Sequence, residues 1–223
     1  MEEEKEHEEE RDVVEVAEEQ EETRGTMVST KLTVAVIIGI LFLGLYVFYI
    51  DAEPTTTTYN GYIFEQKSEN AFETTLLTNQ GDTVIEFRNH PSTVENISYN
   101  NELSLPLRLA QETNGTVYIS ISEELSTRGE AGIAALEISR VTSYIYGVAT
   151  EGAFMQPGIE PSAPVITCEN ATPTTPVITM EQGNQTEIGV NGTCIQLRSD
   201  EPRGLIEAAD ALVYRLTGVI ESE

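Results

Sequence analysis

One uncharged stretch of 19 residues, Leu32–Ile50, constrains this chain more than any other feature. It reads LTVAVIIGILFLGLYVFYI and lies between Lys31 and Asp51. At 1.5 Å per residue, a helix of this length extends roughly 28 Å, close to the ~30 Å hydrocarbon core of a bilayer. A helix in the core of a globular protein would carry a polar stripe, which this stretch lacks. The sequence therefore predicts one transmembrane helix over residues 32–50, with the lipid bilayer as its partner.

The basic residues near this span predict its orientation. Arg24 and Lys31 lie on its N-terminal side, whereas the first basic residue after it is Lys67. Lys and Arg are enriched in the cytoplasmic flanks of membrane helices. We therefore expect a single-pass protein of the cell membrane, with residues 1–31 in the cytoplasm and residues 51–223 outside.

Two alternatives to a permanent anchor are a cleaved signal peptide and a pilin-like leader. A signal peptide has a shorter apolar region and small residues before its cleavage site, which residues 50–52 match poorly. In pilins the apolar run begins almost at the cleavage point, but here Lys31 separates Arg24-Gly25 from the span. An uncleaved signal anchor is the favoured interpretation.

Acidic residues dominate the charge of the chain. There are 38 Asp and Glu against 12 Lys and Arg, for a formal net charge of −26. Such a charge excludes nucleic acid as a natural partner and favours basic proteins, cations or simple solubility. Residues 1–31 hold much of this charge and few apolar side chains, so an acidic, disordered tail is predicted there. The tail also suggests a signalling role, in which it recruits a basic cytosolic protein.

The two cysteines and five glycosylation sequons lie beyond the span. A disulfide between Cys168 and Cys194 is expected outside the cytosol. The alternatives are two unrelated buried thiols, or a metal site, which the absence of CxxC and of a nearby His disfavours. The Asn-x-Ser/Thr sequons are candidate glycosylation sites and support an outside location: Asn96, Asn114, Asn170, Asn184 and Asn191.

The remaining pattern predicts a short linker at residues 51–58 and one domain at residues 59–220. Alternating and apolar runs predict strands at residues 62–64, 72–77, 83–87, 116–121, 164–168, 176–180, 187–190 and 194–197. A hairpin turn is expected at residues 79–82 and a loop at residues 149–163. The predicted fold class is α/β or α+β, with a mixed sheet and two packing helices on the single transmembrane helix.

The two helices are expected at residues 128–146 and from Pro202 to about Gly218. Thr127 and Glu130 have the spacing of a capping box for the first, and Ser199 or Asp200 would cap the second. Asp210 would be partnered by Arg215 or Tyr214. The expected core stripe of the first helix is Ile133, Leu136, Val141, Tyr144, Ile145 and Val148, and that of the second is Leu205, Ala209, Leu212, Leu216 and Val219.

Four stretches resemble uncharacterised archaeal envelope proteins: Pro164–Thr172, Pro176–Ile178, Thr193–Ile195 and Ala208–Val219. The resemblance extends over most of residues 59–220. It implies an archaeal, single-pass, membrane-anchored protein with one paired-cysteine domain outside the membrane. It implies no activity and no catalytic residue, and the long acidic leader departs from the usual short N-terminus.

Motifs of catalysis and cofactor binding do not occur in the sequence. There is no G-x-S-x-G, H-E-x-x-H, Walker A or G-x-G-x-x-G pattern, so neither catalytic residues nor a cofactor is expected. A hydrolase would have to use His90, the one His after the span, or a carboxylate pair drawn from Glu169, Asp200, Glu201 and Asp210. The favoured function is a non-enzymatic, membrane-tethered binding or scaffolding module for another envelope protein. An extracytoplasmic hydrolase and a signalling adaptor are the alternatives.

Overall fold

The computed structural model describes residues 30, 32–46, 55–78, 81–100 and 102–221. The chain divides into two units, Met1–Glu53 and Pro54–Glu223. In the first unit residues 32–46 are α-helical, and their large apolar side chains are 46–69% exposed. Among the described residues, no helix combines the length and the apolar character that crossing a membrane requires. The predicted disordered tail, except Thr30, and residues 47–50 of the predicted span lie outside the described residues.

The second unit begins with a four-stranded antiparallel sheet of order β1-β2-β3-β4. Its strands are β1 (Thr55–Tyr59), β2 (Tyr62–Ser68), β3 (Ala71–Thr78) and β4 (Gly81–Phe87). Three of them were predicted, but residues 55–58 form a strand where a linker was expected. Four consecutive Thr residues supply β-branched side chains that suit an edge strand, although they have no apolar alternation.

A second sheet has six strands in the order β5-β9-β10-β8-β6-β7. Strands β6, β7, β8 and β10 are mutually parallel, whereas β9 runs antiparallel to β10. The strands are β5 (Ser98–Tyr99), β6 (Thr116–Ile121), β7 (Ala149–Phe154), β8 (Val177–Gln182), β9 (Glu187–Asn191) and β10 (Cys194–Ser199). The predicted mixed sheet is therefore confirmed, together with a separate antiparallel one.

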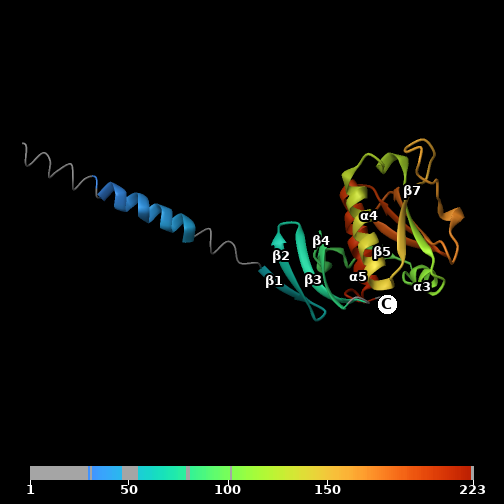
Figure 1. Ribbon diagram of the computed structural model, residues 1–223, viewed down its shortest axis with the longest axis horizontal. Coiled ribbons are helices and arrows are strands. Elements are labelled where there is room, and N and C mark those ends of the chain that lie inside the picture. Colours follow the sequence, from blue (N-terminus) through green and yellow to red (C-terminus); the bar gives the residue numbers. More distant parts are fainter. Residues whose placement is uncertain (1–29, 31, 47–54, 79–80, 101, 222–223) are drawn as a thin grey trace, which may run out of the picture. The chain divides into compact units, whose positions relative to one another are not determined.

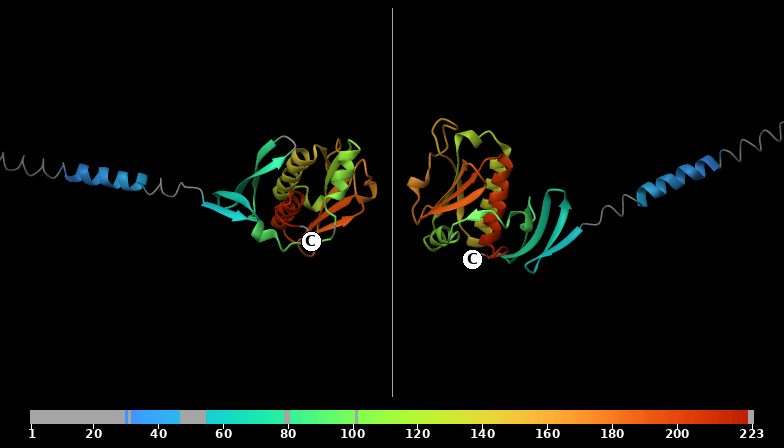
Figure 2. Two further views of the ribbon diagram at one scale, coloured as in Figure 1. Left: turned by 90° about the horizontal axis from the view of Figure 1, so that it is seen from below. Right: turned by 180° about the vertical axis from the view of Figure 1, so that it is seen from behind.

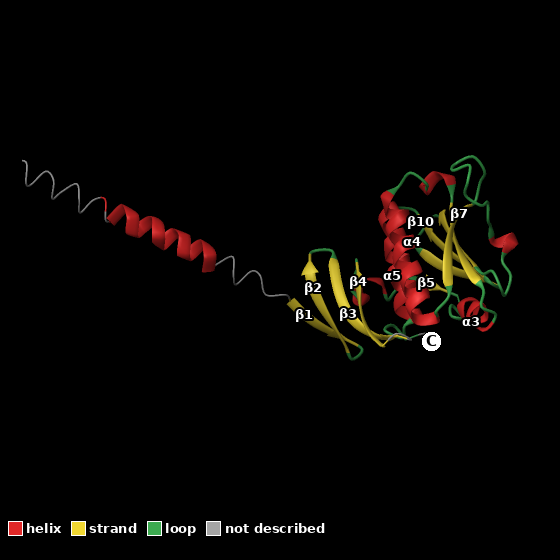
Figure 3. Cartoon of the chain, viewed as in Figure 1, coloured by secondary structure: helices red, strands yellow, loops and turns green. Residues whose placement is uncertain are grey.

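Two long helices, α4 (Gly129–Val141) and α5 (Pro202–Leu216), lie side by side between the two sheets (Figures 1 and 3). Ile119, Ile178 and Ile195 are aligned across β6, β8 and β10 and are almost completely buried in the core. The views in Figure 2 show the same layering from below and from behind. The shorter helices are α2 (Pro91–Val94), α3 (Leu105–Glu112), the 3-10 turns η1 (Glu123–Leu125) and η3 (Cys168–Asn170), and the π-helical turn η2 (Thr142–Tyr146), which continues α4.

The buried face of α4 differs from the predicted stripe. Its buried residues include Ala131, Ala134, Ile138 and Val141, while two members of the predicted stripe are exposed, Ile133 at 38% and Leu136 at 59%. Small side chains on this face let α4 and α5 approach closely, and this contact decides which face is buried. Four members of the stripe predicted for the second helix, Leu205, Ala209, Leu212 and Val219, are completely buried, and the fifth, Leu216, is partly buried against the core.

The helix termini also correct the sequence analysis. Arg128 is the N-cap of α4 and has no side-chain capping bond, so the predicted capping box does not form. Glu201, instead of Ser199 or Asp200, is the N-cap of α5. Gly147 ends the α4–η2 helix in a left-handed conformation with a φ of 65°, as predicted.

Residues 149–168 are arranged differently from the prediction. The expected loop contains strand β7 at its start, and the expected strand at residues 164–168 is reduced to one bridge between Phe154 and Val165. The sequence of β7 does not predict a strand, because Gly152 and the polar residues Thr150 and Glu151 break the apolar alternation. An edge strand does not need that alternation.

The predicted disulfide between Cys168 and Cys194 is confirmed, with the two Cα atoms 5.3 Å apart. Cys194 lies on the face of the six-stranded sheet opposite the aligned isoleucines, so the bond attaches the segment around Cys168 to that face. The same segment is held by the Ser120 hydroxyl, which donates to the Ile166 carbonyl at 2.6 Å. Helices therefore cover one face of the sheet, and a cross-linked segment lies on the other.

Removing the disulfide should destabilise the second unit. The bond closes a loop with a sequence separation of 26 residues, for which the loss of chain entropy in the unfolded state is worth about 3 kcal/mol. We expect the double variant C168A/C194A to lose roughly this much free energy of unfolding in urea titrations of the full chain in detergent. A loss below about 1 kcal/mol would contradict the assigned role of the bond.

Candidate functional site

The five sequon asparagines are all exposed. Asn96 follows α2 and Asn114 follows α3, whereas Asn170 ends η3, Asn184 lies between β8 and β9, and Asn191 is the last residue of β9. The side-chain oxygen of Asn170 also accepts hydrogen bonds from the backbone and hydroxyl of Thr167. Glycosylation of these positions stays a prediction, and their exposure is compatible with it.

His90 is the N-cap of α2 and lies among aromatic rings. Its centroid is 5.3 Å from that of Phe64 and 5.5 Å from that of Phe72. The ring nitrogens hydrogen-bond to the hydroxyls of Ser92 at 2.8 Å and Thr57 at 2.9 Å. Burial lowers the pKa of His90. No carboxylate among the described residues hydrogen-bonds to this ring, so a hydrolytic triad does not assemble around it.

A buried pair of carboxyl groups joins α4, α5 and the end of β4. Asp210 of α5 is completely buried, and its Oδ2 accepts hydrogen bonds from the backbone N–H groups of Arg88 and Asn89 and from the Asn89 side chain, at 2.8–3.1 Å. Glu137 of α4 is 7% exposed and lies 3.5 Å from the Arg88 Nε. Asp210 is therefore bound by residues 88–89, and the predicted partners Arg215 and Tyr214 are wrong.

These two carboxyl groups hold a proton at neutral pH. Burial raises the pKa of Glu137 strongly, and the adjacent Asp210 raises it further, while Arg88 opposes the shift. Burial also raises the pKa of Asp210, against the hydrogen bonds from Asn89 that favour its charged form. Glu137 Oε2 and Asp210 Oδ1 are buried and have no hydrogen-bond partner among the described residues, so a proton retained on the pair would relieve their mutual repulsion.

The carboxylate pair differs from the pairs that the sequence suggested. Glu169, Asp200 and Glu201 are exposed and remote in the chain from Glu137, which the sequence analysis did not single out. A pocket of about 520 Å³ opens beside the pair and is lined by Arg88, Asn89, Arg203 and neighbours. Neither carboxyl group lines that pocket, so the pair is a structural element that does not meet a substrate there.

The buried carboxyl pair should make the free energy of unfolding depend on pH. As pH rises above about 4.5, the ordinary pKa of Glu, the unfolded chain loses its Glu137 proton while the folded chain keeps it. The folded state then binds more protons, and its stability falls with rising pH. We expect E137Q to reduce the stability change between pH 5 and pH 8.5 by about 1–3 kcal/mol in urea unfolding.

The control for this measurement is E124Q, which removes an exposed carboxylate from η1. E124Q should show the same pH dependence as the unmodified chain. An identical pH dependence in E137Q would contradict a shared, retained proton.

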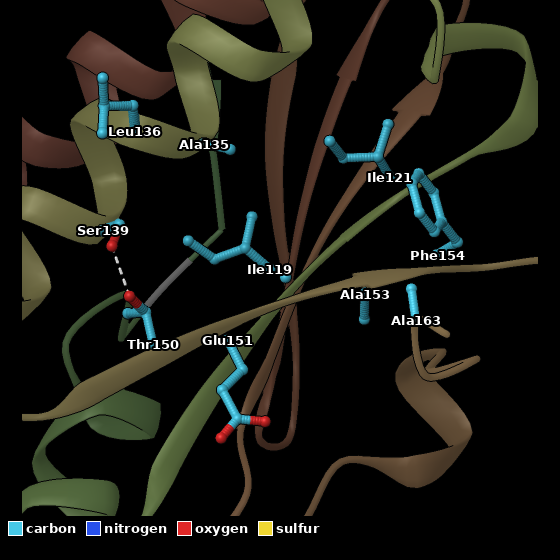
Figure 4. A pocket seen from close by; sticks show the side chains of 11 residues that line it. Ile119, Ile121, Ala135, Leu136, Ser139, Thr150, Glu151, Ala153, Phe154 and Ala163 are labelled. Atoms are coloured by element: carbon cyan, nitrogen blue, oxygen red, sulfur yellow. Dashed lines mark hydrogen bonds between the residues drawn. The ribbon is translucent and has the colours of Figure 1, made fainter. Parts of the chain in front are cut away.

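A largely apolar groove lies between α4 and the edge strand β7 (Figure 4). It encloses about 480 Å³, and its wall on the α4 side includes Ala135 and Leu136. Ile121 and Phe154, partners in adjacent strands, close one end, and a hydrogen bond between Ser139 and Thr150 closes the other. The remaining lining residues are Ile119, Glu151, Gly152, Ala153 and Ala163.

Gly152 leaves open space in the floor of the groove. It is aligned with Ile119 of β6, so its missing side chain leaves a hollow on the face of the sheet that α4 borders. A Cβ atom placed on Gly152 would meet nothing within 4 Å. Leu136, an apolar residue of the predicted core stripe, lines the groove and is 59% exposed.

Comparison with protein-family models, with curated proteins and with solved structures finds no match for this chain. Within the part of the chain that the structure describes, no group of three or more His, Cys, Asp or Glu side chains is arranged to hold a metal ion. The groove and the adjacent edge of β7 are therefore the candidate functional site, and their geometry carries its interpretation.

Proposed function

We propose that this protein is a membrane-tethered, extracytoplasmic module that binds another protein of the cell envelope. The uncharged stretch Leu32–Ile50 is the proposed tether, with residues 1–31 in the cytoplasm. The disulfide supports placement of the second unit in an oxidising compartment, because such bonds persist outside the cytosol.

The observation that carries the binding function is the groove beside β7. Segments of partner proteins commonly dock in grooves with an apolar lining or along exposed sheet edges. The groove has this composition, and Leu136 at its rim exposes an apolar side chain that a partner would cover. The site contains neither a nucleophile–base pair nor a carboxylate pair facing the cavity, so binding accounts for its residues better than hydrolysis does. No specific observation on the described residues favours signalling through the acidic tail.

Charges in the middle of the tether should release the protein from membranes. Each Lys at the centre of a membrane helix costs about 3 kcal/mol on insertion. We expect the unmodified chain to stay in the pellet after alkaline carbonate extraction, and the double variant I40K/L43K to appear in the supernatant. The conservative variant I40L/L43I should behave as the unmodified chain does. If alkaline carbonate also extracts the unmodified chain, the proposed membrane tether is contradicted.

A partner should be captured from the groove and not from an unrelated exposed apolar position. A photo-crosslinking amino acid at Leu136 should give one discrete adduct in native membranes, identified by mass spectrometry. The matched control is Leu77 of β3, which is 80% exposed on the other sheet and should not give that adduct. The same adduct from both positions, or none from Leu136, would contradict binding at the groove.

A further inference from the structure

We propose that the outer edge of β7 binds an extended segment of the partner protein as an added β-strand, with an apolar side chain of that segment seated above Gly152. This inference rests on the proposed binding function and names the chemistry by which the same site recognises its partner.

The backbone of β7 has hydrogen-bonding groups that face away from the sheet. At Phe154 the N–H donates to the Pro164 carbonyl at 3.0 Å, and the carbonyl accepts from the Ile166 N–H at 2.9 Å. Met155, the next residue, donates instead toward β6, to the Ile121 carbonyl. Backbone groups of alternate residues point to the same side of a strand, so those of Gly152 and Thr150 face outward like those of Phe154.

The outward-facing backbone groups of β7 are unpaired in the described structure on the Ala149 side of Phe154, where the pairing with Pro164–Ile166 ends. Within the described residues, β7 pairs with β6 on one side and with Val165 at Phe154 on the other. No backbone hydrogen bond extends from the outer side of Gly152 or Thr150 to another described residue. The segment Pro164–Ile166 already occupies this edge as an extended chain, which shows what kind of occupant the edge accepts. An incoming strand would take the same place farther toward Ala149.

The groove determines which side chain such a strand presents. The side chains of Thr150 and Phe154 lie on the face that α4 borders, as would one at position 152, and those of Glu151 and Ala153 lie on the opposite face. A residue of the added strand that faces α4 next to Gly152 would enter the 480 Å³ hollow. The apolar wall favours a branched aliphatic or aromatic side chain there, and the loss of its hydration would stabilise the complex.

Charge determines the residues on either side. Glu151 is exposed on the opposite face of β7, and residues 51–223 contain 25 Asp and Glu against 8 Lys and Arg. Cross-strand pairs of opposite charge are favourable, whereas like charges repel. The occupant is therefore an extended segment in which an apolar residue alternates with Lys or Arg. A second copy of this acidic chain satisfies that requirement poorly.

The test is selection of random dodecapeptides displayed on phage against the full chain in detergent micelles. Enriched peptides should alternate apolar with basic residues. A synthetic version of the best peptide should bind G152L at least tenfold more weakly than the unmodified chain, because Leu occupies the space above residue 152 that the apolar side chain of the peptide would enter. N-methylation at alternate peptide nitrogens should abolish binding in one register and spare it in the other, since only one set pairs with β7.

The matched control is G129L at the start of α4, which lines the other pocket and not the groove. A Cβ atom at either glycine meets nothing within 4 Å, and neither has a left-handed backbone, so both substitutions are sterically acceptable. G129L should bind the peptide as the unmodified chain does. Circular dichroism and urea titration of both variants separate lost binding from lost folding.

Several outcomes would overturn strand addition. These are equal binding to G152L, indifference to N-methylation in both registers, no enriched peptide, or self-association of the chain that G152L abolishes, which would assign the edge to a second copy. If Leu136 still captures a discrete partner in membranes, only the mode of recognition fails. If Leu136 captures none either, the proposed function fails with it.

Discussion

The arrangement of the second unit depends on one buried carboxylate, that of Asp210. Its three hydrogen bonds come from residues 88–89, which directly follow β4. The Tyr214 hydroxyl, one turn farther along α5, donates to the Asn89 carbonyl at 2.7 Å, and its ring stacks on Phe87 at 4.3 Å. The four-stranded sheet is thus held on α5 by directional polar contacts inside an apolar layer. Polar contacts of this kind specify one orientation, because a misaligned sheet would leave buried donors unpaired.

Glu137 is a second carboxyl group buried beside Asp210. Two ionised carboxylates buried in an apolar layer would repel each other, and burial would remove their hydration. The backbone donors favour charge on Asp210, so the retained proton is best placed on Glu137, whose other oxygen lies near Arg88. Asp210 is stabilised by its backbone donors and Glu137 by the retained proton. The two acids can therefore be buried together where α4, α5 and the end of β4 meet. The polar cluster therefore belongs to the architecture, whereas the surface open to a partner is apolar.

Much of this fold could be predicted from the sequence, and the exceptions have physical reasons. Strands such as β6 and β10 are apolar runs bounded by turn residues, and the two cysteines admit a single pairing. Strands β1 and β7 were not predicted. Both are edge strands, which contribute little to the core and so carry Thr, Glu and Gly. The buried face of α4 was misjudged because Glu137 reads as a surface residue until Asp210 is known to lie opposite. The groove was missed for the same reason as β7, since a hollow made by one glycine becomes visible only when α4 is placed beside it.

The disulfide has a consequence for the groove as well as for stability. Cys168 lies two residues beyond Ile166, whose N–H bonds the edge of β7 at Phe154. The covalent bond to β10 therefore keeps Pro164–Ile166 in place as a terminator of the exposed edge. It therefore determines how many backbone hydrogen-bonding groups of β7 are left for the added strand that we propose. In the proposed strand addition, reduction of the disulfide would leave this segment held only by its hydrogen bonds to Ser120 and Phe154.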